Sequence, residues 1–312
     1  MLGKTAGGLF WMFRYLERSE NTARLIDTGL RMALTRSSGE DEWNSIITTA
    51  GVRPAFDEVH DEASMAHVVD FLLRDRSNPS SVVCILEAAR SNARLVRTAI
   101  TPEVWEATNE CWMSVMDVLK RPVSAKDLPA VLGAIRQQSA LVRGALHGTM
   151  LRNDVYNFAR LGTFVERADN TARILDVKYY TLLPSAGAVG SRLDNAQWET
   201  ILRSVSAHRS FRWLDEQEMS PRAIANFVIF DERLPRSLRF CWQKVTENLF
   251  QLDRTYAKRR DCYDTACQLT EDLQKLTIDE VFETGLHEFL DGFITDNIHL
   301  ASQIERCYRF VE

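Results

Sequence analysis

Apolar residues recur every three or four positions along nearly all of the chain, which is the spacing of one face of an α-helix. No run of alternating apolar and polar residues indicates a β-strand, and only 14 glycines and 8 prolines interrupt the pattern. The sequence therefore predicts an all-α protein. The expected helices span residues 5–35, 40–51, 63–74, 79–99, 102–120, 127–150, 153–183, 194–207, 221–230, 236–258, 262–275 and 277–310.

One stretch of the first predicted helix returns in the middle of the chain. YLERSENTARLID at residues 15–27 and FVERADNTARILD at residues 164–176 share seven of their thirteen positions. Two unrelated segments of average composition would share roughly one position in thirteen. This similarity is the first sign that the chain contains an internal repeat.

Two further pairs of similar segments follow in the same order. They are WNSII with WETIL, at residues 43–47 and 198–202, and FLLRDRSNPSSV with FVIFDERLPRSL, at residues 71–82 and 227–238. The offsets of the three pairs grow slowly, from 149 to 155 and 156 residues, as a tandem duplication with small insertions would leave them. We predict two homologous halves, residues 1–150 and 151–312, that pack as one compact helical bundle with approximate pseudo-twofold symmetry.

The composition narrows the classes of function. The 312 residues are 45% hydrophobic and 26% charged with a formal net charge of −5, which is typical of a globular protein and argues against nucleic-acid or membrane-surface partners. No apolar run approaches the roughly eighteen residues of a membrane span. The first residues lack the pattern of a signal peptide, so we expect a cytoplasmic protein with reduced cysteines. The six cysteines and six histidines form no CxxC, HxH or HExxH motif, and we expect neither a metal nor a cofactor.

The repeated segment places polar residues on one face of its helix. At about 100° per residue, this face carries Arg14, Glu17, Asn21 and Arg24. Apolar side chains flank the face, which indicates that its charges are at least partly buried. Buried charges need hydrogen-bonding partners. Within the helix, Glu17 can contact Asn21 at i+4, and Asn21 can contact Arg24 at i+3.

The second copy repeats the arrangement with Glu166, Asn170 and Arg173 at the same spacing. Arg18 and Arg167 turn away by about 100° and can reach another element. The polar residues of both copies form our candidate site, and its role stays open. They can be structural ion pairs that lock the two halves together. They can instead line a cavity where arginines bind an anionic ligand, such as phosphate or carboxylate, and a glutamate serves as base or binds an ammonium group. A solvated polar face is the third alternative.

Two weaker sets extend this candidate site. ILEAARSNARLVR, at residues 85–97, resembles the repeated segment and adds Glu87, Arg90, Asn92 and Arg94. GLHEFLD places the polar pair His287 and Glu288 in an otherwise apolar helix. A helix histidine held by a structural hydrogen bond is a more common explanation for such a pair than a catalytic histidine.

The opening TAGGLFWMFRYLERSENTARLID resembles the start of the bacterial alpha-E domain family, which is all-helical and named for its Glu-Arg motif. Further blocks resemble the family in order, and together they cover essentially the whole chain: CILEAARSNARLVRTAITPEVWEATN, FARLGTFVERADNTARILD, FDERLPRSLRFC and GLHEFLD. The two halves would then be two alpha-E helical repeats. Phe13 stands where the family usually has Gly, and Thr163 stands where the first copy has Arg14, so we expect the two helices to differ in detail.

The resemblance also implies a partner. Members of this family are typically encoded beside, or fused to, a circularly permuted ATP-grasp protein, and ATP-grasp enzymes form amide bonds. The resemblance therefore implies a non-catalytic binding or scaffold subunit that acts with an ATP-grasp amide or peptide ligase in peptide synthesis or modification. One alternative is an enzyme whose Glu/Arg/Asn site between the two repeated helices binds an anionic or amino-acid-like substrate. Another is a structural homo-oligomer.

Overall fold

The computed structural model describes residues 1–33, 40–181, 192–214 and 219–311. Every regular element in these ranges is an α-helix, which confirms the all-α prediction. The first part of the chain forms α1 (Gly3–Ala33), α2 (Glu40–Thr49), α3 (Arg53–Asp57), α4 (Met65–Leu73), α5 (Val82–Leu95), α6 (Pro102–Val118) and α7 (Leu128–Thr149). The second part forms α8 (Asp154–Thr181), α9 (Arg192–Ser204), α10 (His208–Arg212), α11 (Pro221–Phe230), α12 (Leu238–Tyr256), α13 (Asp261–Lys275), α14 (Ile278–Thr284) and α15 (Leu286–Cys307).

Most helices begin and end close to the residues that the sequence indicates, with one clear correction. The helix predicted over 277–310 is two helices, because Gly285 has φ +106° between α14 and α15. Glycine adopts such a backbone without the steric penalty that other residues meet. The helices α3 and α10 were not predicted, since each is only five residues long and too short to show a helical period.

Two serines begin equivalent long helices in the two halves. The Ser81 side chain accepts a hydrogen bond from the backbone N–H of Cys84 at the start of α5, and Ser237 accepts one from Phe240 at the start of α12. Such N-caps satisfy backbone donors that the first turn of a helix leaves unpaired. Ser81 and Ser237 lie at the same place in the similar segments 71–82 and 227–238.

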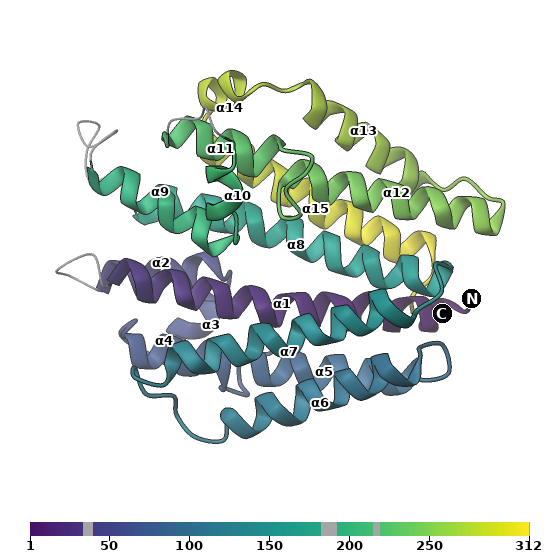
Figure 1. The fold of residues 1–312 in the computed structure, drawn as a ribbon, viewed down its shortest axis with the longest axis horizontal. Helices are drawn as coiled ribbons and strands as arrows, with labels where there is room; N and C mark the ends of the chain where they lie inside the picture. The colour runs from purple at the N-terminus through teal and green to yellow at the C-terminus, as the bar shows by residue number, and fades with distance from the viewer. Residues whose placement is uncertain (34–39, 182–191, 215–218, 312) are drawn as a thin grey trace.

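The helices α1 and α8 lie side by side at the centre of the molecule (Figure 1). They come closest at Gly162, where an added Cβ would lie 2.1 Å from the backbone oxygen of Phe10. Only glycine allows two helix backbones to approach so closely. The helices α5 and α7 pack on α1 from one side, and α12 and α15 pack on α8 from the other.

The two halves share their order of helix packing. Each begins with a long central helix that packs on the central helix of the other half, and α2 packs on α8 as α9 packs on α1. The helix pairs α5–α6 and α12–α13 also correspond. This order agrees with the predicted duplication. The duplication itself, and the boundary near residue 150 between α7 and α8, stay predictions.

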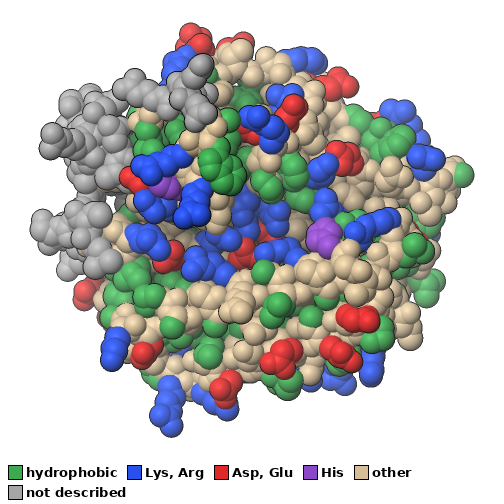
Figure 2. All heavy atoms as spheres, viewed as in Figure 1, with side chains coloured by type: hydrophobic (Ala, Val, Ile, Leu, Met, Phe, Trp, Pro, Cys, Tyr) green, Lys and Arg blue, Asp and Glu red, His purple; other side chains and the backbone are tan. Residues whose placement is uncertain are grey.

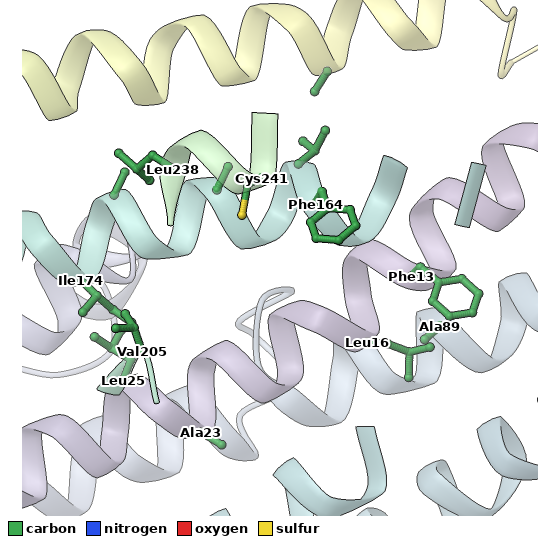
Figure 3. Close-up of a cluster of buried hydrophobic side chains, with 14 of the residues drawn as sticks. Phe13, Leu16, Ala23, Leu25, Ala89, Phe164, Ile174, Val205, Leu238 and Cys241 are labelled. Carbon is green, nitrogen blue, oxygen red and sulfur yellow. The ribbon is translucent and has the colours of Figure 1, made fainter. Parts of the chain in front are cut away.

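A continuous hydrophobic core lies around the central helices (Figure 3). On one side Phe13 and Leu16 of α1 lie next to Ala89 of α5, and on the other Phe164 of α8 lies near Cys241 of α12. Phe13 is 1% exposed, so its large ring is fully enclosed in this core. Each such side chain contributes about 1.5–3 kcal/mol when fully buried.

Candidate functional site

The two Glu-Arg motifs face each other across α1 and α8 and exchange partners. Arg167 donates from Nε and Nη2 to the Glu17 carboxylate, at 2.8 and 3.0 Å. Arg18 donates from Nε and Nη2 to the Glu166 carboxylate, at 2.5 and 3.0 Å. Glu17 and Glu166 are equivalent positions in the repeated segment, and so are Arg18 and Arg167. The two pairs are therefore reciprocal, as the contacts of a twofold interface are.

Both glutamates are buried, as their apolar flanks predicted. Glu17 is 1% exposed and Glu166 is 4% exposed. Burial would raise the pKa of Glu17, but Arg167 and Arg236 outweigh it and hold the pKa well below its usual range. The same balance holds for Glu166, where burial is outweighed by Arg18 and Arg14 and the pKa is lowered. Both carboxylates are therefore ionised at neutral pH.

The sequence interpretation missed three residues of this network: Glu20, Arg143 and Arg236. Glu20 is 1% exposed and accepts hydrogen bonds from Arg236 Nη2 at 2.6 Å and from Arg143. Glu20 lies at the edge of the polar face, about 60° from Glu17, and was not included in it. Arg143 comes from α7 and Arg236 from the residue before the cap of α12, and no local pattern connects them to α1. The one available signal was the position of Arg236 in a repeated segment.

The expected contacts within α1 are wrong. Glu17 pairs across the helix interface rather than with Asn21, and Arg24 donates from Nε and Nη2 to Glu20 at 3.0 and 2.7 Å. The Oδ1 atom of Asn21 accepts a hydrogen bond from Arg236 Nη1 at 3.3 Å. Charge-assisted, two-pronged arginine pairs are stronger than a neutral amide contact, which explains why they win the competition.

Arginines outnumber carboxylates on the side of the interface that carries Glu17 and Glu20. Those two glutamates are bonded by four arginines: Arg24, Arg143, Arg167 and Arg236. Figure 2 shows Lys and Arg side chains gathered at the middle of this view of the molecule, between the upper and lower halves. The local charge is therefore positive, although the whole chain carries a net charge of −5.

A pocket of about 220 Å³ lies on the side of Glu166, and both repeated helices line it. Its lining includes most of the candidate polar residues, together with loop residues between α2 and α3 and before α5: Arg18, Asn21, Thr22, Leu25, Thr49, Ala50, Gly51, Val52, Leu72, Ser80, Glu166, Asp169, Asn170 and Arg173. We call it the ER pocket. Arg173 donates to Asp169 at 2.8 Å, so the acidic groups in the lining already have arginine partners.

Two buried polar atoms of the ER pocket have no hydrogen-bond partner among the described residues: Asn21 Nδ2 and Thr49 Oγ1. Asn21 is 3% exposed and Thr49 is 6% exposed. The orientation of the Asn21 amide follows from its other contact, because an arginine can only donate and Oδ1 must therefore face Arg236. Unpaired buried polar groups are uncommon, and both of these belong to residues that line one pocket.

The weaker candidates on α5 do not join this site, so that extension is wrong. Glu87 pairs with Arg76 at 2.8 Å, and both side chains are at least half exposed. Arg90 donates to Asn109 of α6 at 2.8 Å, while Arg94 is exposed. Asn92 lines a different hollow, near the N-terminus of α1. The similarity of α5 to the repeated segment reflects the residues that helices favour. The small residues Ala89 and Ala93 of α5 are buried, and the helix packs on α1.

The His287 and Glu288 pair is also separate from the network. His287 Nδ1 lies 2.7 Å from Asp176 Oδ1 of α8. This hydrogen bond raises the pKa of His287. Glu288 is exposed. The contact between His287 and Asp176 joins α15 to α8, which fits the structural role that the sequence favoured for this histidine.

The carboxylates of the site are already bound by arginines. Glu17, Glu20, Glu166 and Asp169 are each bonded to at least one arginine, and a carboxylate paired with arginine is a poor base. Among the described residues, no group of three or more His, Cys, Asp or Glu side chains is arranged to hold a metal ion. None of the described helices is both long and apolar enough to span a bilayer.

The fold and site define an all-helical protein with two facing Glu-Arg motifs. Residues 1–308 match the Alpha-E family, which is described as a predicted alpha-helical domain with a conserved ER motif. The chain belongs to the Alpha-E family, as its resemblance indicated.

Its curated relatives include uncharacterised mycobacterial proteins. One from Mycobacterium bovis and one from Mycobacterium tuberculosis are each 25% identical over 278 residues, and a second from M. tuberculosis is 24% identical. Each match covers 81% of this chain but only 29% of the relative, so these relatives are much longer. No solved structure matches the chain.

Proposed function

We propose that this chain is a non-catalytic binding subunit that holds a small amino-acid-like ligand in the ER pocket and docks a circularly permuted ATP-grasp amide ligase. One observation carries the binding role. The carboxylates of the pocket are paired with arginines, whereas Asn21 and Thr49, which line the pocket, each keep one buried polar atom without a partner among the described residues. Such a site can recognise a polar ligand, but each carboxylate in its described lining is paired with an arginine and is not free to act as a base or to activate the Thr49 hydroxyl.

The size of the pocket restricts the ligand. Pockets for drug-sized ligands usually measure about 300–1,000 Å³. The ER pocket measures about 220 Å³, which suits a single amino acid or a similar small molecule better than a peptide. A larger substrate would extend out of the pocket, where the ligase would act on it.

The ligase partner is supported by the family resemblance and by the length of the relatives. About 71% of each mycobacterial relative lies outside the matched region, since the match covers 29% of its length. A fused catalytic region would account for that length. We expect the same cooperation for this chain in the cytoplasm, in peptide synthesis or modification.

Co-purification from the native host tests this function. The tagged chain is isolated at low salt, and the recovered proteins and small molecules are identified by mass spectrometry, with an untagged strain as control. We expect the ATP-grasp protein in the tagged sample alone, together with an amino-acid-like compound. A preparation that contains neither would contradict the proposal.

An enzyme is the second candidate, because both repeated helices line one concave pocket. In that case the purified chain alone would convert an amino-acid-like substrate, with Glu166 or Asp169 as the base. Mass spectrometry of a substrate mixture, incubated with the wild type and with Glu166→Gln, separates the candidates. A product that forms without ligase and disappears in the variant would favour the enzyme.

A further inference from the structure

Ser80 and Arg236 occupy corresponding places in the two halves. They are paired in the similar segments 71–82 and 227–238, at an offset of 156 residues. Each directly precedes the serine that caps the N-terminus of the next helix, Ser81 for α5 and Ser237 for α12. The two caps have nearly the same backbone, with φ −63° and ψ 151° at the first and φ −69° and ψ 155° at the second.

Arg236 fills its place with a cation. Its guanidinium donates to Glu17 at 3.0 Å, to Glu20 at 2.6 Å and to Asn21 Oδ1 at 3.3 Å. The side chain is 7% exposed, so the space between α1 and the start of α12 is closed. Two carboxylates and one amide oxygen of the repeated segment in α1 thus hold the guanidinium group of Arg236.

Ser80 leaves the corresponding place open. The residues that correspond to Glu17, Glu20 and Asn21 in the repeated segment are Glu166, Asp169 and Asn170. All three line the ER pocket, and so does Ser80. A serine side chain ends after one hydroxyl and cannot supply a guanidinium. The ER pocket therefore lies where the other half has the side chain of Arg236.

The unpartnered hydroxyl of Thr49 has a similar origin. The corresponding Ser204 shares a hydrogen bond with the Thr28 hydroxyl of α1. In the other half Val177 stands in the place of Thr28 and has no hydroxyl to offer. Thr49 Oγ1 therefore has no partner among the described residues, and Thr49 and Asn21 both line the ER pocket.

The charges around the ER pocket define the ligand further. Glu166 and Asp169 are bonded by three arginines: Arg14, Arg18 and Arg173. These five groups carry a net charge of about +1, as Glu17 and Glu20 do with Arg24, Arg143 and Arg167. Arg236 raises that charge to about +2 but is tethered to the chain, whereas a free ligand that brought only a cation would meet the same excess without this advantage. A ligand with an added carboxylate avoids this, because its two charges cancel. Asn21 Nδ2, Thr49 Oγ1 and Arg18 are donors for such a carboxylate.

We propose that the ER pocket binds a zwitterionic amino acid, with its ammonium or guanidinium group in the place that corresponds to Arg236, against Glu166, Asp169 and Asn170. Its carboxylate faces Asn21, Thr49 and Arg18. This assignment rests on the proposed function and specifies its ligand. The cationic group of the ligand would then bind in one half as the side chain of Arg236 binds in the other.

The substitution Ser80→Arg tests the assignment, because it supplies the missing guanidinium from the chain itself. Binding is measured by calorimetric titration of each of the twenty standard amino acids, with guanidinium chloride as a probe that has only the cation. We expect at least one amino acid to bind the wild type, and guanidinium to bind at least tenfold more weakly. We expect Ser80→Arg to weaken amino-acid binding at least tenfold and to raise the melting temperature.

Ser77→Arg is the matched control. It adds the same charge to the same loop at an exposed residue that does not line the ER pocket, so binding should be unchanged. If Ser80→Arg does not fold, as judged by circular dichroism, Asn170→Ala replaces it, and we expect that variant to bind at least tenfold more weakly. The assignment is overturned if no amino acid binds the wild type, or if the folded variant binds as tightly. Ligase co-purification can still succeed in that case, so the two failures are distinguishable.

Discussion

Glu17 and Arg167 form a two-pronged ion pair, with N–O distances of 2.8 and 3.0 Å, although they lie 150 positions apart in the chain. Their chain neighbours Arg18 and Glu166 form the reciprocal pair. A motif of two adjacent, oppositely charged residues can therefore join two copies of one helix, because each copy provides both the acid and the base. This geometry explains why Glu and Arg must stand together in both copies.

The buried guanidinium of Arg236 should be costly to remove. Arg236→Ser takes a hydrogen-bonded cation from Glu17 and Glu20 and opens a space in the interface. We expect the free energy of unfolding to fall by about 3–5 kcal/mol, which is typical when one partner of a buried pair is removed. Urea unfolding followed by circular dichroism measures this loss.

Arg233→Ser is the control for that measurement. Arg233 lies in the same loop and pairs with Asp231 at 2.9 Å, but its side chain is 72% exposed. Exposed ion pairs contribute only about 0–1 kcal/mol. Equal losses in the two variants would show that burial of Arg236 is not what stabilises the interface.

The close approach of α1 and α8 at Gly162 predicts a strong response to one added methyl group. In Gly162→Ala the new Cβ would lie 2.1 Å from the backbone oxygen of Phe10, so the two central helices must move apart. We expect a destabilisation of about 1–3 kcal/mol or more, as for other overpacked sites, and a lower melting temperature.

Gly133→Ala is the opposite case within α7. An added Cβ at Gly133 meets no atom within 4 Å, and alanine favours a helix interior by roughly 0.5–1 kcal/mol over glycine. We therefore expect Gly133→Ala to raise the melting temperature slightly. A Gly162→Ala variant as stable as Gly133→Ala would contradict the predicted helix contact.

The sequence was sufficient to predict the central helices and the burial of Glu17 and Glu166, because apolar residues flank the polar face of each copy. It also indicated that Arg18 and Arg167 reach other elements. It could not supply Arg143 or Arg236, since only the three-dimensional packing brings them to α1. The ER pocket was equally hidden, because it depends on the small size of Ser80 at a place where the other half carries an arginine.

His147 of α7 should titrate well below an ordinary histidine. Burial lowers its pKa to about 4, and Arg160, Arg152 and Arg143 oppose its protonation as well. The hydroxyl of Tyr156 lies 2.9 Å from Nδ1, which suits a neutral ring that accepts the hydrogen bond. Proton NMR should give a titration midpoint near 4. A midpoint at or above 6.5, the ordinary value, would contradict this environment.

This pKa has a direct consequence for stability. Between pH 6.5 and about 4 the unfolded chain binds a proton at His147 that the folded chain does not. The contribution of His147 is therefore complete above pH 6.5 and is lost as the pH falls toward 4. Arg160→Gln removes one opposing charge and should move the NMR midpoint upward, whereas Arg254→Gln, at an exposed position of α12, should leave it unchanged.

The central claim is that the two Glu-Arg motifs join the halves of the chain, and a double-mutant cycle on Glu17 and Arg167 tests it most directly. The free energy of unfolding is measured for Glu17→Gln, Arg167→Met and the double variant. We expect each single change to cost about 3–5 kcal/mol, and the double change to cost less than the sum by about 1–3 kcal/mol, because neither charge is then left buried alone. Single changes that cost less than about 0.5 kcal/mol, or costs that add within about 0.3 kcal/mol, would contradict the claim.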